Sequence, residues 1–421
     1  MGSDRYWLSI IFPIAAISSG FSVLIPLYIL ELHGNVMDVS LATTAYSLVV
    51  IPASLFWGEL TQKSGKIRLF IASSVIAIIP VIVLLYFLRS IELAIIMYAV
   101  YAFVLTASSP AINMLIMKKR RKTILRSYYG IYSLFGIIGN IMGYVPGVLL
   151  FGNVIAEYLL ILFGFNIASL LFVGIFVTKE PKRAGNEQEI RLHRLFPLLN
   201  SISRFPQILT GHHFIVKIAE MRKRKKTMRI VTILAAVSLV NFGIYLFNTS
   251  YIPFLYSYRV SYSDIFLISM LNGLGQAAIY LVFIAGKAGG TLRHYYRVST
   301  VVRSGGYLVA LASFMSFAAF LYLNLLSYFI AGLGYALWNI SASVIIYTNI
   351  VGKMEAHYIG VWSAIIGLSG VLGALFSGFL SFYVGYSFTF AASILFTLSS
   401  ILVFNNAYHD GDKIRDLGNR I

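Results

Sequence analysis

Twelve apolar spans divide the chain, and the polar segments between them alternate sharply in charge. The two tails and every second gap, with the span ends beside them, hold 31 of the 33 Lys and Arg residues. The other gaps hold only Arg89 and Arg259. Because Lys and Arg are retained on the cytoplasmic side during insertion, this pattern predicts an integral protein of the cell membrane with both termini in the cytoplasm.

Composition agrees, since 59% of the residues are hydrophobic and only 11% are charged, against about 25% charged in soluble domains. A membrane-spanning helix needs roughly 20 apolar residues, so the fold class we expect is an all-α polytopic membrane protein whose main partner is the lipid bilayer. The absence of cysteine rules out disulfides and thiolate chemistry. We expect a monomer with the spans 7–30, 39–60, 68–88, 92–117, 127–151, 157–178, 230–256, 264–286, 298–320, 325–351, 357–384 and 386–406.

One long connection separates six spans from six. Because this connection is long and basic, we expect the chain to have three parts. They are an N-terminal six-helix bundle at 1–178, a basic cytoplasmic linker at 179–229, and a C-terminal six-helix bundle with a short tail at 230–421. Apolar residues recur at helical spacing beside arginines within the linker, a pattern of helices that lie on anionic lipid. A solvated linker of modest order is an equally good interpretation. The linker has no interleaved aromatic or base-reading groups, so we expect no nucleic-acid partner.

The two halves carry weak internal similarity. Ile25-Pro26 recurs as Ile252-Pro253, and Gly130, Ser133 and Gly143 recur as Gly360, Ser363 and Gly373. Asp38 likewise recurs as Asp264, and the offset of all these pairs stays between 226 and 230. Because six is an even number, two copies of a six-helix unit enter the membrane in the same orientation, and a cavity between such parallel halves is the natural place for a solute.

The turn after the second span carries the most specific motif. It runs through Gly58, Leu60, Gln62, Lys63, Gly65 and Lys66. This turn resembles the signature of the major facilitator superfamily, G-x-L-x-D-[RK]-x-G-[RK], at the matching place in the topology. The resemblance implies two pseudo-symmetric six-helix bundles and a cytoplasmic gate at this turn. Gln62 stands at the acidic position, which removes the ion pair of the family's gate.

Small residues line the fifth and eleventh spans and predict close helix packing. The residues concerned are Gly139, Gly143, Gly147, Gly370 and Gly373. The first three also loosely resemble the superfamily's antiporter pattern, although Tyr144 replaces its proline. Generic packing is the preferred interpretation, and a drug-type exporter is the alternative.

The interior of the spans lacks carboxylates, which proton-coupled transporters commonly place there. Coupling therefore uses Glu31 or Asp38 near a span end, or transport is uncoupled. Arg303 is the one charge appreciably inside a span. It lies about 9 Å from the start of the expected span by helix rise, and we expect its side chain to reach the surface by snorkelling.

Neutral polar and aromatic residues remain for solute contact. Because the superfamily places helices one, four, seven and ten around its cavity, the resemblance adds Ser18, Ser22, Tyr98, Tyr101 and Asn113 to the candidates. The other predicted cavity residues are Asn241, Tyr245, Asn248, Asn272, Gln276, Tyr335, Trp338 and Asn339. For any one Asn, an interhelical hydrogen bond is the competing interpretation. Amides and hydroxyls over aromatic faces favour an uncharged or cationic organic solute, and an interior without fixed cations argues against phosphates and carboxylates.

The sequence contains no enzyme signature in a suitable structural context. Residues 273–278 fit a dinucleotide fingerprint formally, yet they lie within an apolar span with no strand before them. His212-His213 has no further ligands nearby in the sequence, so we expect no metal, no cofactor and no enzymatic activity. The leading hypothesis is a secondary transporter that moves a small organic solute by alternating access. A membrane-embedded enzyme or lipid flippase is the less favoured hypothesis.

Overall fold

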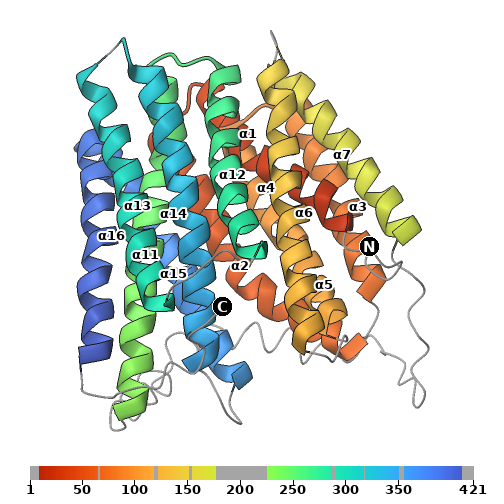
Figure 1. Cartoon of the computed structure of the whole chain (residues 1–421). Coiled ribbons are helices and arrows are strands. Elements are labelled where there is room, and N and C mark those ends of the chain that lie inside the picture. Colours follow the sequence, from red (N-terminus) through yellow and green to blue (C-terminus); the bar gives the residue numbers. More distant parts are fainter. Residues whose placement is uncertain are drawn as a thin grey trace, which may run out of the picture.

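The computed structural model describes residues 9–64, 67–117, 122–150, 154–176, 225–285, 291–316, 318–349 and 355–409. Within these ranges the regular structure is helical (Figure 1). The first six spans are α1 (Ile11–Glu31), α2 (Val36–Ser64), α3 (Ile67–Phe87), α4 (Ile91–Leu105) with α5 (Ser108–Met117), α6 (Lys122–Leu149) and α7 (Val154–Phe176). The second six are α11 (Lys225–Ser257), α12 (Tyr262–Ile284), α13 (Leu292–Ala312), α14 (Phe320–Asn349), α15 (Glu355–Tyr383) and α16 (Tyr386–His409).

Twelve helical segments in the described part are long and apolar enough to cross a membrane, which confirms the predicted fold class. The fourth span is interrupted at Thr106–Ala107, between α4 and α5. The seventh helix begins at Lys225, inside the segment expected as linker, and the rest of that linker lies outside the described residues.

Capping side chains explain where several helices begin. The side chains of Ser90, Ser261 and Thr291 each accept a hydrogen bond from the backbone N–H three residues later, at the start of α4, α12 and α13. Asn35 also caps α2, because its Oδ1 accepts from the backbone N–H of Met37, two residues later, at 2.7 Å. Each cap satisfies a backbone donor that the first turn of a helix leaves unpaired.

The ninth span differs from its prediction. The helix begins at Leu292, six residues before the expected start, and ends at Ala312, followed by a short 3-10 turn over Ser313–Met315. The expected start at residue 298 followed hydropathy alone and skipped a polar first turn. The Thr291 cap, which bonds His294 N, makes that polar turn helical.

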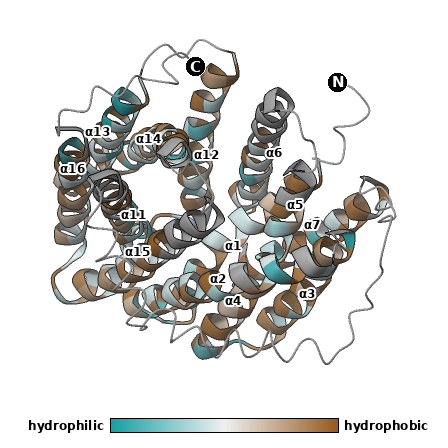
Figure 2. Ribbon diagram, turned by 90° about the horizontal axis from the view of Figure 1, so that it is seen from below, coloured by the Kyte–Doolittle hydropathy of each residue, from teal (hydrophilic) through white to brown (hydrophobic). Residues whose placement is uncertain are grey.

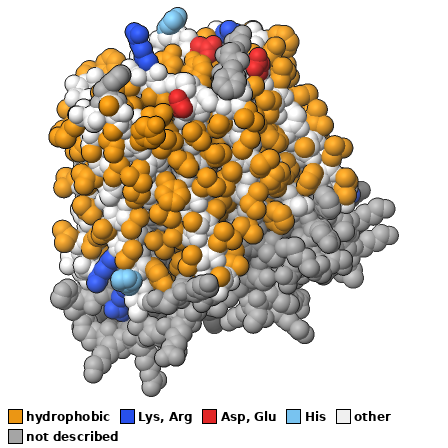
Figure 3. Space-filling model, turned by 45° about the horizontal axis from the view of Figure 1, so that its top comes forward, with side chains coloured by type: hydrophobic (Ala, Val, Ile, Leu, Met, Phe, Trp, Pro, Cys, Tyr) orange, Lys and Arg blue, Asp and Glu red, His pale blue; other side chains and the backbone are white. Residues whose placement is uncertain are grey.

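The helices run between two faces of the molecule (Figure 1). We call the end that holds the start of α1 and the α2–α3 turn the basic face, and the end that holds the turns at residues 32–35 and 258–261 the opposite face. Apolar side chains cover the surface between the two ends, and acidic side chains gather at the opposite face (Figure 3). Large exposed side chains such as Leu171 and Leu402 fit contact with lipid.

The two sets of six spans meet mainly along two helix pairs. Seen from the basic face, α2 lies beside α15 and α6 lies beside α12 (Figure 2). Ser40 on α2 donates a hydrogen bond to Ala374 O on α15 at 2.6 Å. The backbone of Gly147 on α6 lies so close to the Phe266 ring on α12 that an added Cβ would overlap it.

Three apolar clusters show how the sets are joined. The shared cluster contains buried residues of both sets, including Phe21, Leu24, Tyr28, Phe254, Ile265 and Phe266. These residues lie toward the opposite face. At the basic face there are two separate clusters: Ile11, Phe70 and Val173 belong to one of the first six spans, and Ile233, Tyr296 and Phe404 to one of the second six. The two sets are therefore packed into one core at the opposite face and hold separate cores at the basic face.

Candidate functional site: a central cavity

A cavity of about 310 Å³ lies between the two sets of spans. Its wall comes from α1, α2, α4, α6, α11, α12 and α14, so both sets contribute to it. The lining carries no ionisable acid or base other than tyrosine. The lining residues are Ser18, Ser22, Val23, Pro26, Thr43, Tyr46, Tyr98, Tyr101, Tyr144, Tyr245, Asn248, Thr249, Ile252, Ser269, Asn272 and Tyr328.

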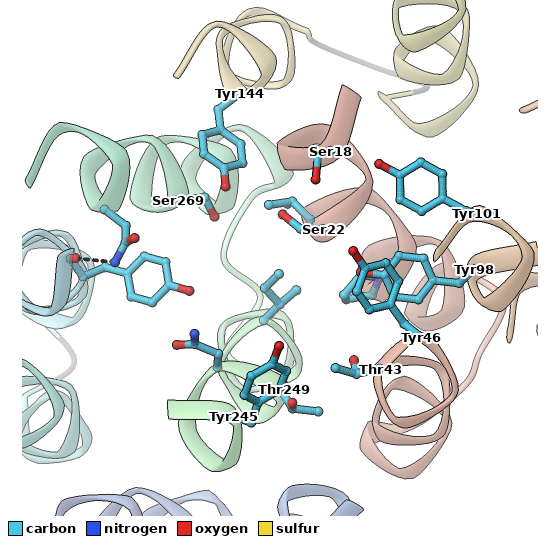
Figure 4. A pocket seen from close by; sticks show the side chains of 16 residues that line it. Ser18, Ser22, Thr43, Tyr46, Tyr98, Tyr101, Tyr144, Tyr245, Thr249 and Ser269 are labelled. Atoms are coloured by element: carbon cyan, nitrogen blue, oxygen red, sulfur yellow. Dashed lines mark hydrogen bonds between the residues drawn. The ribbon is translucent and has the colours of Figure 1, made fainter. Parts of the chain in front are cut away.

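Stacked tyrosines form one side of the wall. The rings of Tyr46 and Tyr98 stack at 4.6 Å between centroids, and Tyr101 stacks on Phe21 at 4.3 Å. Ring stacking holds these side chains in place and leaves their hydroxyl edges for other partners. Tyr144 from α6 and Tyr245 from α11 direct their hydroxyls into the cavity from opposite sides (Figure 4).

A hydrogen-bonded chain forms the wall where α12 meets α14. Gln276 Nε2 donates to Asn272 Oδ1 at 2.7 Å, and Asn272 Nδ2 donates to the main-chain oxygen of Tyr328 at 3.0 Å. The Tyr328 ring stacks on Tyr251 at 4.5 Å. The Asn272 amide and the Tyr328 ring are therefore fixed relative to each other.

Some polar atoms of the wall have no protein partner. Asn248 Oδ1 and Thr249 Oγ1 are among the buried atoms that make no hydrogen bond. A buried polar group without a partner costs about 1–3 kcal/mol, so such groups usually have a reason in native proteins. A bound solute or its water would supply the missing partners at this position.

The chain matches a known protein family over most of its length. The family model described as Major Facilitator Superfamily matches residues 7–354. The chain belongs to the major facilitator superfamily. No curated protein matches the sequence.

Solved structures of other superfamily-type transporters share the fold. A mutant form of the nucleoside transporter NupG aligns with a TM-score of 0.69 at 13% identity, over 97% of this chain and 100% of that one. A POT family transporter in complex with 5-aminolevulinic acid gives 0.72 at 11% identity, covering 96% and 94%. A D-xylose-proton symporter gives 0.67 at 12% identity, covering 96% and 95%. The family and these neighbours identify a transporter and not an enzyme.

The structure separates the predicted cavity residues into two groups. Tyr245, Asn248 and Asn272 line the cavity, together with Ser18, Ser22, Tyr98 and Tyr101, which the superfamily resemblance indicated. Gln276 lies behind Asn272 and orients it. The side chain of Asn113 lies outside the described residues.

The other predicted cavity residues make contacts away from the wall. Asn241 Nδ2 donates to Ile366 O at 2.9 Å and to Ser369 Oγ at 3.0 Å, which ties α11 to α15. Asn339 Nδ2 donates to the Tyr280 hydroxyl at 2.9 Å. Trp338 and Tyr335 pack with the apolar cluster of the second set at the basic face.

Sequence reasoning missed part of the wall because it considered the superfamily's helices one, four, seven and ten, with two residues of the eighth. Helices α2 and α6 also contribute, and α12 and α14 contribute residues that were not predicted. A polar or tyrosine residue inside an apolar span was the available signal. The missed residues include Thr43, Tyr46, Tyr144, Ser269 and Tyr328.

Only part of the predicted gating motif lies within the described residues. Gly58 has open space where a Cβ would lie, and Leu60 packs against the apolar cluster of the first set at the basic face. The side chains of Gln62 and Lys63, and residues 65 and 66, lie outside the described part of the chain. The gate at this turn therefore stays a prediction.

Close approaches occur at all five glycines predicted to pack helices. A Cβ on Gly139 or Gly143 would overlap the α1 backbone at Phe12 or Ala16. Gly373 lies against Phe242 O, and Gly370 lies against the ring of Tyr245. The α15 glycines therefore let Tyr245 pack against the α15 backbone, with its hydroxyl directed at the cavity.

The expectation that Arg303 snorkels to the surface is wrong. Because α13 begins at Leu292, Arg303 lies eleven residues into the helix, which is about 16 Å at 1.5 Å per residue. The residue is only 2% exposed. Its Nε donates to the Tyr307 hydroxyl at 2.5 Å and its Nη1 to Ala331 O at 3.2 Å, so the guanidinium is held between α13 and α14.

A metal site finds no support in the described part of the chain, because no three His, Asp or Glu side chains gather there. The wall instead offers hydroxyl and amide groups together with aromatic faces. These are the groups with which small-molecule pockets form hydrogen bonds and ring contacts.

Proposed function

We propose that this member of the superfamily carries a small polar organic solute across the membrane by alternating access. The observation that supports the proposal best is the central cavity, whose wall is shared by both sets of spans and presents hydroxyls and amides. A rocking movement of one set against the other would expose such a site to each side of the membrane in turn.

The size of the cavity favours a small solute. Its volume of about 310 Å³ is at the low end of the ~300–1,000 Å³ usual for small-molecule pockets. The neighbouring structures are named for a nucleoside, 5-aminolevulinic acid and D-xylose, all molecules of modest size. We propose a solute of this size, in the range of a sugar, a nucleoside or an amino-acid derivative.

The packing of the two faces supports alternating access. At the opposite face the sets are joined by the shared cluster and by hydrogen bonds between α12 and the first set. The Tyr262 hydroxyl donates to Glu31 Oε2 at 3.3 Å, and Ser263 Oγ donates to Val148 O at 2.6 Å. Separate clusters at the basic face fit a conformation that is closed at the opposite face. We propose that the basic face is cytoplasmic, from the Lys and Arg distribution.

A coupling carboxylate is absent from the cavity wall. Glu31 is the carboxylate best placed to act in transport, because it bonds Tyr262 across the two sets at the opposite face. This arrangement is compatible with uncoupled transport and with coupling through Glu31. Uptake should respond to a pH gradient only if Glu31 couples transport to protons.

The drug-exporter alternative depended on Gly139, Gly143 and Gly147. These glycines lie at close helix contacts with α1 and with Phe266, so packing alone accounts for them. The comparisons do not add support for export, and we do not propose it.

Flux into proteoliposomes tests the proposal. Radiolabelled D-xylose, uridine and 5-aminolevulinic acid are offered with and without a pH gradient. We expect saturable uptake of at least one of them, and loss of that uptake in Ser269→Trp, because the indole fills the cavity. The control is Leu402→Trp, a change at a side chain that is 68% exposed on the lipid-facing surface. Uptake that survives Ser269→Trp, or no uptake of any of the three solutes, would contradict the proposal.

A further inference from the structure

Arg303 is a positive charge buried behind the cavity wall. Its guanidinium lies over two aromatic rings, with Cζ 5.4 Å from the ring centroid of Tyr307 and 5.1 Å from that of Tyr335. The hydrogen bonds to the Tyr307 hydroxyl and to Ala331 O complete its surroundings. The groups that hold the guanidinium are therefore neutral.

The charge has no acidic partner in the described part of the chain, where no carboxylate hydrogen-bonds to it or pairs with it. Ring faces and carbonyl dipoles favour a cation at short range, but they do not cancel its net charge. Buried charges in a membrane protein are expensive and are kept mainly where they serve transport or ligand binding. The field of Arg303 therefore extends beyond its immediate contacts.

The group that Arg303 bonds on α14 lies one helical turn from a residue of the cavity wall. Tyr328, Ala331 and Tyr335 lie on one face of α14 at helical spacing of three and four residues. Arg303 bonds the carbonyl of Ala331, while Tyr328 lines the cavity one turn away. The guanidinium also lies over the ring of Tyr335, one turn further along the same helix.

We propose that Arg303 gives the cavity a positive potential at its α14 side, so that the site prefers solutes with an anionic or electron-rich group and disfavours cations. The proposal deepens the proposed function, on which it depends, by naming the charge class of the solute. It also reverses the preference for a neutral or cationic solute that an interior without fixed cations suggested. A carboxylate or phosphate of the solute would lie near Tyr328 and Asn272.

The field is measurable without knowing the solute, because the chain contains no cysteine. A single cysteine is placed at the α12 side of the cavity in Ser269→Cys or at the α2 side in Thr43→Cys. The two residues lie on opposite sides of the cavity (Figure 4), and Ser269 is one turn from Asn272, whose amide bonds α14. Each thiol is then modified with an anionic, a cationic or a neutral methanethiosulfonate reagent.

Rates with the charged reagents are divided by the rate with the neutral reagent, which removes effects of access and of thiol ionisation. We expect the anionic-to-cationic ratio to be higher in Ser269→Cys than in Thr43→Cys, on the order of tenfold for a unit charge at this range. Arg303→Gln should remove most of the difference, and Arg303→Lys should keep it. If Arg303→Gln does not fold, the comparison of the two positions in the Arg303 background still decides.

Equal ratios at the two positions would overturn the proposal and leave the proposed transport function standing. A ratio that survives Arg303→Gln would likewise assign the field to another group. Failure of the neutral reagent to modify either cysteine would mean that the cavity is closed to small molecules. That result would contradict the proposed function itself, and with it the inference drawn from it.

Discussion

Asn272 donates a hydrogen bond from its Nδ2 to the main-chain oxygen of Tyr328, 3.0 Å away. The bond joins α12 to α14 at the point where both helices meet the cavity, and the close approach of Gly332 to the Asn272 backbone lets them lie this near. One amide therefore both packs two helices and forms part of the wall.

Substitution Asn272→Ala should weaken solute binding more than it weakens the fold. It removes the hydrogen bond to Tyr328 and an amide of the wall, and a typical hydrogen bond contributes about 0.5–1.5 kcal/mol. We expect KM for the transported solute to rise several-fold while the unfolding temperature falls only slightly. Gln276→Ala should cause a smaller rise, because Gln276 acts through Asn272. Initial uptake rates over a range of solute concentrations measure both; an unchanged KM in Asn272→Ala would remove it from the site.

Substitution Asn241→Ala should reduce stability and leave KM unchanged. The Asn241 side chain is 6% exposed and ties α11 to α15 through Ile366 and Ser369. Interhelical hydrogen bonds in membranes contribute about 0.6 kcal/mol on average, so two of them should lower the thermal unfolding midpoint in detergent measurably. Ser369→Ala, which removes one partner, is the matched control and should have about half the effect. A raised KM with an unchanged midpoint would instead place Asn241 in the solute site.

Substitution Gly147→Ala should favour opening of the opposite face. A methyl group there would overlap the Phe266 ring, which belongs to the other set of spans. We expect a cysteine introduced at Val148 to react faster with an impermeant thiol reagent when Gly147→Ala is also present. Gly164→Ala is the control, because nothing lies within 4 Å of its added Cβ. Equal reactivity in the two variants would show that the contact with Phe266 does not hold this face closed.

The Glu31–Tyr262 hydrogen bond should contribute to the same closure. Glu31→Ala and Tyr262→Phe each remove one side of it, and their effects on that cysteine's reactivity should be less than additive if the two groups act as a pair. Asp38→Ala is the comparison, because Asp38 bonds the backbone N–H of Asn35 within its own turn. If Glu31 also carries the coupling proton, Glu31→Gln should abolish any effect of a pH gradient on uptake. A gradient effect that persists in Glu31→Gln would exclude that role.

The spans could be predicted from the sequence because each one depends on a local run of apolar residues. The side of each helix that meets the cavity could not. Asn241 and Asn248 lie seven residues apart on one face of α11, yet only Asn248 reaches the cavity. At Asn241 the neighbouring α15 packs against α11, whereas at Asn248 the cavity lies beside the helix. The sequence of α11 alone does not show where along the helix this packing ends.

Arg303 shows the same limit in another form. The apolar run alone predicted that the ninth span begins at residue 298, which placed the charge near a surface. The polar turn from Leu292 to Arg297 belongs to the helix because Thr291 caps it, and this shifts Arg303 toward the middle of the membrane. The tyrosine rings beneath the guanidinium come from α13 itself and from α14. They come together only when the two helices pack, so the sequence of α13 alone does not predict the contact.

The shared cluster at the opposite face has a consequence for pharmacology. Opening that face would expose rings such as Phe254 and Phe266 to water, so in this conformation a competitor arriving from that side meets a sealed surface. Blocking molecules should therefore act first from the basic face. A compound that acts from the opposite face would need to enter between Glu31 and Tyr262. Its potency would then depend on how often the two sets of spans separate at that contact.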